Sequence, residues 1–332
     1  MSDLYPLLMR PAFDPRPWGA HDLSPIYPGR RFEEKIGEAW LTGDACQIAN
    51  GPLRGNSLAE LSEQFGRELL GSAAPDPVRF PLLLKFLFPH EKLSVQVHPD
   101  DVAARLLGQP WGKTECWYVA HARPGAQIAL GLKTGVTVAQ FEQSVHQQKA
   151  EELLRWIEVF PGDMIYVAGG TVHTLGPGAV IVETQQQSDI TYRLYDYGRP
   201  RELHLKQGLA VVKERMASGK VVPVASLELN GGKNRILPLI AAPYFVVDRF
   251  ELGEPLNLQQ DDSGKTSAQI LVAVEGCGVV EGSGTPPVTL AKGDAIVIPA
   301  SLGEVCVRPQ WQIEFLRAYV PGKLLPEPAT TI

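Results

Sequence analysis

Two side chains that could bind a cation lie two residues apart in the segment LSVQVHPDD, residues 93–101. Gln96 and His98 alternate with two valines in a run that is typical of a strand, and successive side chains of a strand point to opposite faces. The amide and the imidazole therefore share one face, and the valines share the other. An edge strand with a polar outer face would give the same pattern, because antiparallel sheets often have one face in water.

Two further side chains extend this set of possible ligands. Glu115, in GKTECWYVA, stands at the start of an aromatic strand, and His173, in GGTVHTLGPG, follows a glycine turn. Alone, the glutamate would be a solvated strand end and the histidine a hydrogen-bonded turn residue. Together, two imidazoles, a carboxylate and an amide form a set of donors that zinc accepts, with an open position for Lewis-acid chemistry. Fe(II) or Mn(II) would accept the same donors, so the residue types do not fix the metal.

The composition is that of an ordinary globular protein. The chain has 332 residues, 44% of them hydrophobic, which is enough for two domains or one large double-sheet domain. Its 31 basic and 37 acidic residues are dispersed and give a net charge of -6, so we expect neither nucleic acid nor a membrane as a partner. No run approaches the ~20 apolar residues of a membrane span, and the first residues lack the pattern of a signal peptide. The four cysteines form no CxxC pair, which favours a cytoplasmic location.

The elements that must position these ligands are mainly short strands. The 32 glycines and 28 prolines exceed their usual combined share of about 12%, as expected for many turns. Short β-branched or aromatic runs between turn residues predict strands, and their spacing favours a β-sandwich or barrel. The clearest of these runs are AQIALGL, MIYVAGG, AVIVETQQ, ITYRLYDY, YFVVDRFEL, AQILVAVEGCGVV, DAIVIPA and WQIEFLRAYV.

Helical patterns are few. Residues 57–71 open with Ser57 and Glu60, which have the spacing of a capping box, and end at a glycine. Residues 136–160 predict two short helices that run into a strand, and residues 204–219 predict one amphipathic helix. These helices would lie around the strands rather than form the core.

One internal repeat is visible. PGDMIYVAGGTVH (161–173) and KGDAIVIPASLGE (292–304) share a Gly-Asp pair, an apolar strand and a turn of small residues. The repeat predicts two related β-barrels. Only the first copy ends in a histidine, so we expect a metal-binding domain over residues 1–225 and a degenerate copy of it over residues 226–332.

Four motifs occur in one order along the chain: QVHPDD, GKTECWY, GDMIYVAGGTVHTL and VETQQQSDITYRLYDYGR. In this the sequence resembles the short bacterial form of the type I phosphomannose isomerases of the cupin superfamily, which interconvert mannose 6-phosphate and fructose 6-phosphate. The resemblance implies a mainly β fold of two cupin-type jelly-roll barrels with a few peripheral helices. It also implies one zinc ion per chain, bound by Gln96, His98, Glu115 and His173. We expect a monomer or a weak homodimer.

The resemblance assigns active-site roles to two further residues, and position beside a candidate ligand adds a third catalytic candidate. Asp189 and Arg193 lie on one face of the strand predicted in SDITYRLYDYGR, where a surface ion pair would be the ordinary explanation. Lys113 lies two residues before Glu115 and would share the face of that ligand. Arg193 would stabilise an enediolate or orient the substrate. Either Asp189 or Lys113 would be the base that moves the proton.

Two more residues are candidate substrate contacts. Lys85 lies within the apolar run PLLLKFLF, where a lysine must reach solvent or meet a partner. The phosphate of a small-molecule sugar phosphate would be a suitable partner. Glu183, in VIVETQQ, is a strand carboxylate whose role could be structural or could be substrate binding.

The leading hypothesis is therefore a zinc-dependent isomerase that transfers a proton between C1 and C2 of the sugar through a cis-enediol. The alternatives are an isomerase of a different aldose and a non-catalytic sugar-phosphate-binding cupin. A cupin dioxygenase would usually present several histidines to Fe(II), and the glutamine ligand argues against it. Only 16 residues separate His98 from Glu115, so the helical insertion of longer family members is missing at this point.

Overall fold

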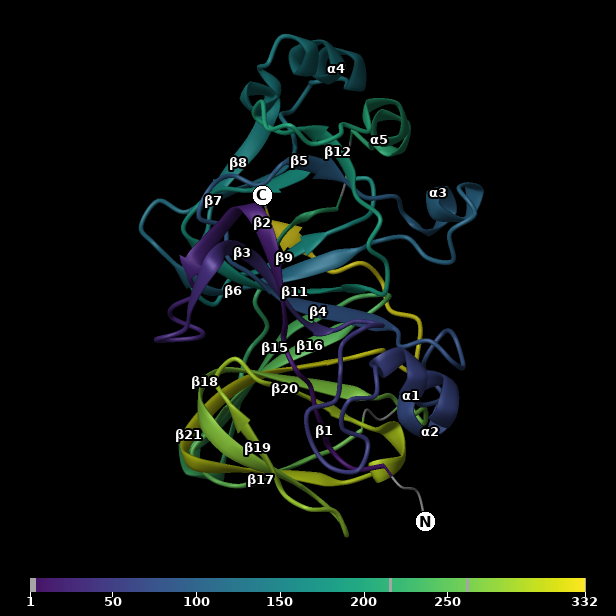
Figure 1. Ribbon diagram of the computed structural model, residues 1–332, viewed down its shortest axis with the longest axis vertical. Coiled ribbons are helices and arrows are strands. Elements are labelled where there is room, and N and C mark those ends of the chain that lie inside the picture. Colours follow the sequence, from purple (N-terminus) through teal and green to yellow (C-terminus); the bar gives the residue numbers. More distant parts are fainter. Residues whose placement is uncertain (1–3, 215–216, 261–262, 332) are drawn as a thin grey trace.

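The protein is built from three antiparallel β-sheets in its described part. The computed structural model describes residues 4–214, 217–260 and 263–331. Within these ranges the sheets have five, eight and nine strands, and they follow one another from the top to the bottom of Figure 1. Short helices lie at the periphery, so the predicted mainly β fold with peripheral helices is confirmed.

The eight-stranded sheet forms the middle layer. Strands β4 and β11 at its centre are buried over their whole length. A polar residue within either strand must therefore find its partner inside the protein. In spatial order the strands are β2 (Ala12–Asp22), β3 (Arg31–Thr42), β4 (Leu82–Leu87), β11 (Ala179–Gln186), β6 (Glu115–Ala122), β9 (Met164–Val167), β13 (Gly219–Val221) and β22 (Thr330–Thr331).

The five-stranded sheet carries three of the predicted site residues. Cross-strand pairing places both His173 and Arg193 opposite Gln96, one on each side of it. The two valines that flank Gln96 are fully buried in an apolar cluster, as the alternation predicted. In spatial order the strands are β12 (Tyr192–Tyr195), β5 (Val95–Val97), β10 (His173–Leu175), β7 (Gln127–Leu132) and β8 (Leu154–Glu158).

The nine-stranded sheet surrounds a separate apolar core, in which the rings of Phe250 and Phe315 stack at 5.0 Å.

Both ends of the chain cross between the halves, because β1 pairs with β20 and β22 joins the middle sheet through β13. The division at residue 225 stays a prediction. The strands are β1 (Leu7–Leu8), β20 (Ala295–Ile298), β18 (Gln269–Gly282), β21 (Val305–Tyr319), β16 (Val246–Leu252), β15 (Asn234–Ala241) and β14 (Leu227–Leu229), with β17 (Leu256–Leu258) on β21 and β19 (Val288–Ala291) on β18.

The repeated sequence makes the same turn twice. Asp163 accepts a hydrogen bond from the backbone N–H of Phe160 at 2.9 Å, and Asp294 accepts one from Ala291 at 3.0 Å. Each aspartate follows a glycine with positive φ and precedes a buried strand, β9 or β20. Only the first copy then leads to a buried histidine.

The helices match the sequence predictions in part. Ser57 and Glu60 make both hydrogen bonds of the capping box, but Gly66, with φ 47°, divides the predicted helix into two. The 136–160 segment forms a helix, a 3-10 turn and strand β8, as predicted. No helix in the described ranges is long and apolar enough to cross a membrane. The helices are α1 (Leu58–Phe65), α2 (Arg67–Leu70), α3 (Asp101–Leu106), α4 (Val138–His146) and α5 (Leu205–Val211), and the 3-10 turns are Ala150–Leu153, Asn230–Gly232 and Ala300–Leu302.

The helix predicted over residues 204–219 is shorter than expected. It ends at Val211, and Val212 is already extended. The backbone N–H of Lys213 donates to the carbonyl of Gly170 at 2.9 Å, so a tertiary hydrogen bond replaces the next helical one. Residues 215 and 216 of this prediction lie outside the described part of the chain.

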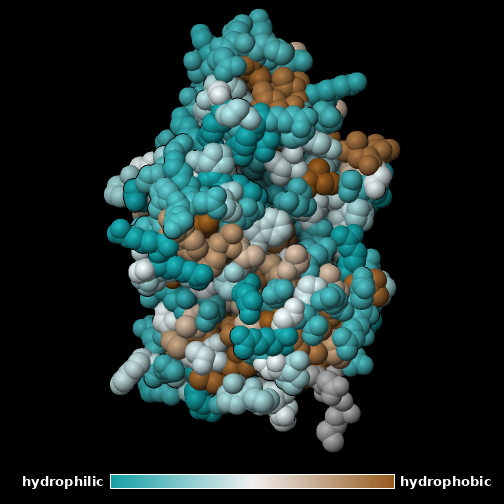
Figure 2. All heavy atoms as spheres, viewed as in Figure 1, coloured by the Kyte–Doolittle hydropathy of each residue, from teal (hydrophilic) through white to brown (hydrophobic). Residues whose placement is uncertain are grey.

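The viewed surface is mostly hydrophilic, with hydrophobic side chains gathered in small patches (Figure 2). The large apolar side chains lie in four buried clusters instead, the largest of which contains residues of both the middle and the nine-stranded sheet. The middle and nine-stranded sheets therefore share one apolar core. The five-stranded sheet packs on a separate apolar cluster.

Candidate active site and metal centre

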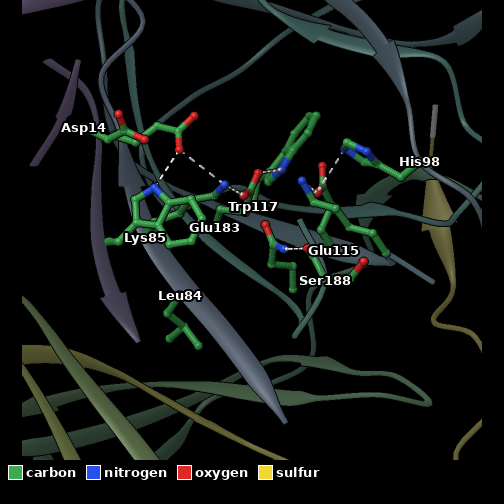
Figure 3. Close-up of polar contacts among 12 residues, drawn as sticks. Asp14, Leu84, Lys85, His98, Glu115, Trp117, Glu183 and Ser188 are labelled. Carbon is green, nitrogen blue, oxygen red and sulfur yellow. Dashed lines mark hydrogen bonds and ion pairs between the residues drawn. The ribbon is translucent and has the colours of Figure 1, made fainter. Parts of the chain in front are cut away.

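Three predicted metal ligands converge inside the protein. His98 follows strand β5, Glu115 begins β6 and His173 begins β10. Their possible ligand atoms all lie within 4.8 Å of one another. The Nε2 atoms of His98 and His173 are each 3.5 Å from a different carboxylate oxygen of Glu115. Figure 3 shows His98 and Glu115 pointing toward each other.

Gln96 completes this group. Its side-chain Nε2 is 3.3 Å from Nε2 of His173, which lies directly opposite on the neighbouring strand. The two ends of an amide are assigned from the hydrogen-bond network, and turning the amide over brings Oε1 to the same place. The structure thus brings together all four residues that the sequence proposed as ligands.

Hydrogen bonds to backbone carbonyls fix both imidazoles. Nδ1 of His98 is 2.8 Å from the carbonyl of Ile190, and Nδ1 of His173 is 2.9 Å from the carbonyl of Thr171. A carbonyl only accepts, so Nδ1 carries the proton in each ring and Nε2 faces Glu115 with its lone pair. This is the arrangement in which histidine binds a metal.

The atoms at the centre of the group make no hydrogen bond with the described residues, although Lys113 forms an ion pair with one oxygen of Glu115. Nε2 of His98 and both carboxylate oxygens of Glu115 are buried there without a hydrogen bond. Buried polar atoms are normally paired, and three unpaired acceptors that surround one point repel one another. A divalent cation would satisfy all three, so the residues fit a metal ion.

The pKa values agree with this interpretation. Burial lowers the pKa of His98 well below its ordinary range and lowers that of His173 to about 4, so both rings are neutral near pH 7. Burial raises the pKa of Glu115 to about 8, and the nearby Glu183 adds to this effect, while Lys113 and Lys85 oppose it. A buried carboxylate in this position needs additional positive charge to be ionised, and metal binding would supply it.

Lys113 lies beside the ligand group. It is 3% exposed, and its Nζ is 3.4 Å from Oε2 of Glu115. Its backbone N–H donates to the carbonyl of Pro99 at 2.9 Å, which holds the approach to β6 against the segment that follows His98. The expected common face of Lys113 and Glu115 is thus present in the structure.

Lys85 finds its partners within the protein. Its Nζ is 3.1 Å from Glu183, its neighbour across β4 and β11, and 3.6 Å from Glu38 (Figure 3). The indole of Trp117 donates to Glu183 at 3.1 Å, and that of Trp40 donates to Glu38 at 2.8 Å. The lysine is 4% exposed, so two carboxylates share one buried positive charge. The sequence did not indicate Glu38, because nothing local links it to Lys85.

The buried Glu38 makes acid stability testable. Burial alone would raise the pKa of its carboxyl, but Lys85 and Arg16 lower it to about 2. A group whose pKa is lower in the folded state stabilises the fold above its unfolded pKa, and this stabilisation is lost as pH falls through the folded value. We therefore expect Glu38→Gln to lower the free energy of unfolding at pH 7 by about 3 kcal/mol. The difference from the wild type should shrink between pH 4.5 and pH 2, measured by urea unfolding.

The matched control for this prediction is Glu33→Gln, at an exposed glutamate on the same strand. That variant should follow the wild-type curve at every pH. An equal loss of stability in Glu38→Gln at pH 3 and pH 7 would contradict the assigned role of Glu38.

Asp189 and Arg193 do not pair with each other. Asp189 is exposed, and Arg193 donates from Nη1 to the carbonyl of Glu202 at 2.7 Å. In the described part of the chain neither residue forms an ion pair within 4.0 Å. The surface ion pair that would explain both residues without a function is therefore absent there.

One cavity of about 470 Å³ is lined by the predicted site residues other than His98, Glu115 and His173. Lys85, Lys113, Glu183, Asp189 and Arg193 all line it, and so does Gln96. Five further polar residues of its wall were not predicted from the sequence. The only signal for them was the polar composition of the PRPWG and GRPRELH segments and of the strand ends. These residues are Arg16, Glu38, Ser94, Thr191 and Arg201.

Comparisons with known proteins point to one family. Residues 27–111 match the family described as phosphomannose isomerase type I, catalytic domain. The chain is 35% identical over 311 residues to mannose-6-phosphate isomerase ManA of Bacillus subtilis, a match that spans 90% of this chain and 94% of that protein. It is 34% identical over 310 residues to the mannose-6-phosphate isomerase of Streptococcus mutans, spanning 90% and 93%.

The fold agrees with the sequence matches. The crystal structure of the mannose 6-phosphate isomerase from Bacillus subtilis superposes with a TM-score of 0.83 at 30% identity. The superposition covers 94% of this chain and 99% of that chain. The similarity therefore extends over all three sheets.

Proposed function

This chain belongs to the type I phosphomannose isomerase family, and from that premise we propose that it interconverts mannose 6-phosphate and fructose 6-phosphate with one bound zinc ion. An aldose–ketose isomerase of this kind needs an electrophile, a base and a site for the phosphate. The observation that carries the proposal is the set of three buried acceptor atoms on His98 and Glu115 that make no hydrogen bond within the described residues. They face a common point beside the cavity.

We propose that Gln96, His98, Glu115 and His173 hold the ion. Two imidazole nitrogens, a carboxylate and an amide oxygen suit zinc and leave room for substrate oxygens. When bound, zinc would act as a Lewis acid toward the oxygens on C1 and C2 of the sugar. The backbone carbonyls of Ile190 and Thr171 would keep both rings in the ligating tautomer.

Proton transfer falls to Lys113 or Asp189. The reaction removes the proton from C2 of the aldose and returns one to C1 through a cis-enediol, so one base can serve both carbons. Lys113 is buried beside Glu115, with its Nζ 3.4 Å from that carboxylate. Asp189 is exposed at the cavity wall. This geometry supports Lys113 more strongly.

Arg193 would stabilise the developing negative charge or orient the open sugar. It lies opposite Gln96 across β5 and β12, lines the cavity and remains charged at any working pH. Lys85 and Glu183 would contact the substrate from the cavity wall. Because each already neutralises the other, their contacts suit sugar hydroxyls as well as phosphate.

The direct test is incubation of the purified protein with mannose 6-phosphate, with and without a chelator. We expect fructose 6-phosphate to form, its formation to stop after metal removal, and zinc to restore it. A non-catalytic sugar-phosphate-binding cupin would bind the sugar without exchanging its C2 hydrogen with solvent. An isomerase of a different aldose would convert another sugar faster. Either result would overturn the proposal.

A further inference from the structure

Most of the positive charges in the active-site cavity are already neutralised by neighbouring carboxylates. Arg16 pairs with Asp14 at 2.7 Å and with Glu38 at 3.1 Å. Lys85 also pairs with Glu38, at 3.6 Å, and with Glu183, at 3.1 Å. Lys113 lies next to a metal ligand. A phosphate dianion brought to any of these three would approach carboxylates as well as the cation.

The segment between β12 and α5 has a different charge balance. Arg199 and Arg201 share one carboxylate, that of Asp196, which is 2% exposed. Arg193 forms no ion pair among the described residues, and the nearby Glu202 has a side chain that is 84% exposed to solvent. Arg199 and Arg201 thus share a single buried negative charge, and Arg193 adds a third positive charge near them. These three arginines outnumber the one buried carboxylate among them, and an anion would compensate the excess positive charge.

Asp196 holds Arg201 in one orientation. Nε and Nη2 of the guanidinium donate to the two carboxylate oxygens, each at 2.7 Å, so one edge of the planar group is fixed. The Nη1 group remains for another acceptor, and Arg201 lines the same cavity as Gln96 and Lys113. Such a side chain loses little further conformational entropy when it binds an anion.

Arg193 lies close enough to Arg201 for the two charges to repel. Burial lowers the pKa of Arg193, and the positive charge of Arg201 lowers it further. Both residues line the cavity. A doubly charged oxyanion between them would relieve this repulsion and accept several charge-assisted hydrogen bonds.

We propose that Arg201, held in place by Asp196, is the residue that anchors the phosphate group of the sugar substrate, with Arg193 as the second cation. The inference rests on the proposed function, which requires a phosphate site but left it to Lys85. It makes the Arg201–Asp196 pair a determinant of specificity for phosphorylated over free sugars. Lys85 then serves the cavity wall and not the phosphate.

The test compares the holoenzyme with Arg201→Met, Arg201→Lys and Asp196→Asn. Calorimetric titration with inorganic phosphate measures the site directly, and steady-state kinetics gives KM for mannose 6-phosphate. We expect Arg201→Met to weaken phosphate binding and to raise KM, each by about 10- to 100-fold, with a smaller change in kcat and unchanged metal content. Arg201→Lys should fall between Arg201→Met and the wild type, because it keeps the charge but loses the second N–H edge. Asp196→Asn should weaken phosphate binding by a smaller factor.

The control is Arg123→Met, at an exposed arginine outside this cavity, which should bind phosphate as the wild type does. Unchanged phosphate affinity and KM in a folded Arg201→Met protein would overturn the proposal. So would a loss of kcat with phosphate affinity preserved, because that result would place Arg201 in the chemistry or in the fold. The titration does not depend on turnover, so a protein that binds phosphate through Arg201 but fails to isomerise mannose 6-phosphate would refute only the proposed function.

Discussion

Replacing His173 with alanine is expected to lower kcat/KM for mannose 6-phosphate about a thousandfold, because the variant loses one of the two imidazoles proposed to hold the metal. The side chain is 1% exposed, and its Nε2 lies 3.5 Å from a carboxylate oxygen of Glu115. Bound zinc should fall well below one ion per chain. Steady-state kinetics and elemental analysis of the dialysed protein measure both effects.

His121→Ala is the matched control. His121 lies on β6, the strand that Glu115 begins, but it is exposed and lines a different cavity. Its variant should keep the wild-type activity and metal content. Full zinc occupancy in His173→Ala would contradict the assigned ligand set.

Replacing Lys113 with methionine is expected to lower kcat by about a hundred- to ten-thousandfold while bound zinc is retained. Methionine fills similar space but cannot accept a proton. The buried Nζ lies 3.4 Å from the proposed ligand Glu115, so the amine would lie near the ion but outside the proposed ligand set. Exchange of the C2 hydrogen of mannose 6-phosphate with deuterated solvent, followed by NMR, should slow by the same factor.

Two companion variants sharpen this second prediction. Lys133→Met changes an exposed lysine and should leave the rate unaltered. Asp189→Asn removes the other candidate base, and if Lys113 is the base it should retain measurable solvent exchange. A Lys113→Met protein with the wild-type rate and pH–rate profile would remove that lysine from the mechanism.

The sequence signals that single out each candidate ligand are local. The alternation in LSVQVHPDD predicts which side chains face the valine cluster, and the structure buries both valines behind Gln96. The repeated Gly-Asp turn is likewise a short-range pattern, and its hydrogen bonds recur in both copies. Fold class follows from many such short runs and turns.

Features that depend on contacts between distant segments were not predictable in this way. Glu38 meets Lys85 only because β3 and β4 are neighbours in the sheet. The two-residue strands β1 and β22 are too short for a periodic signal, yet they link the halves of the protein. The helix that begins at Leu205 ends early because a backbone hydrogen bond from Lys213 to Gly170 competes with it. In each case tertiary pairing overrides local preference.

The most direct test of the account is anomalous diffraction at the zinc absorption edge from crystals of the protein as purified. We predict one strong peak per chain, bounded by the side chains of Gln96, His98, Glu115 and His173. A fully active protein with no peak at that position, or with its peak among other residues, would contradict the claim that these four groups share one catalytic ion.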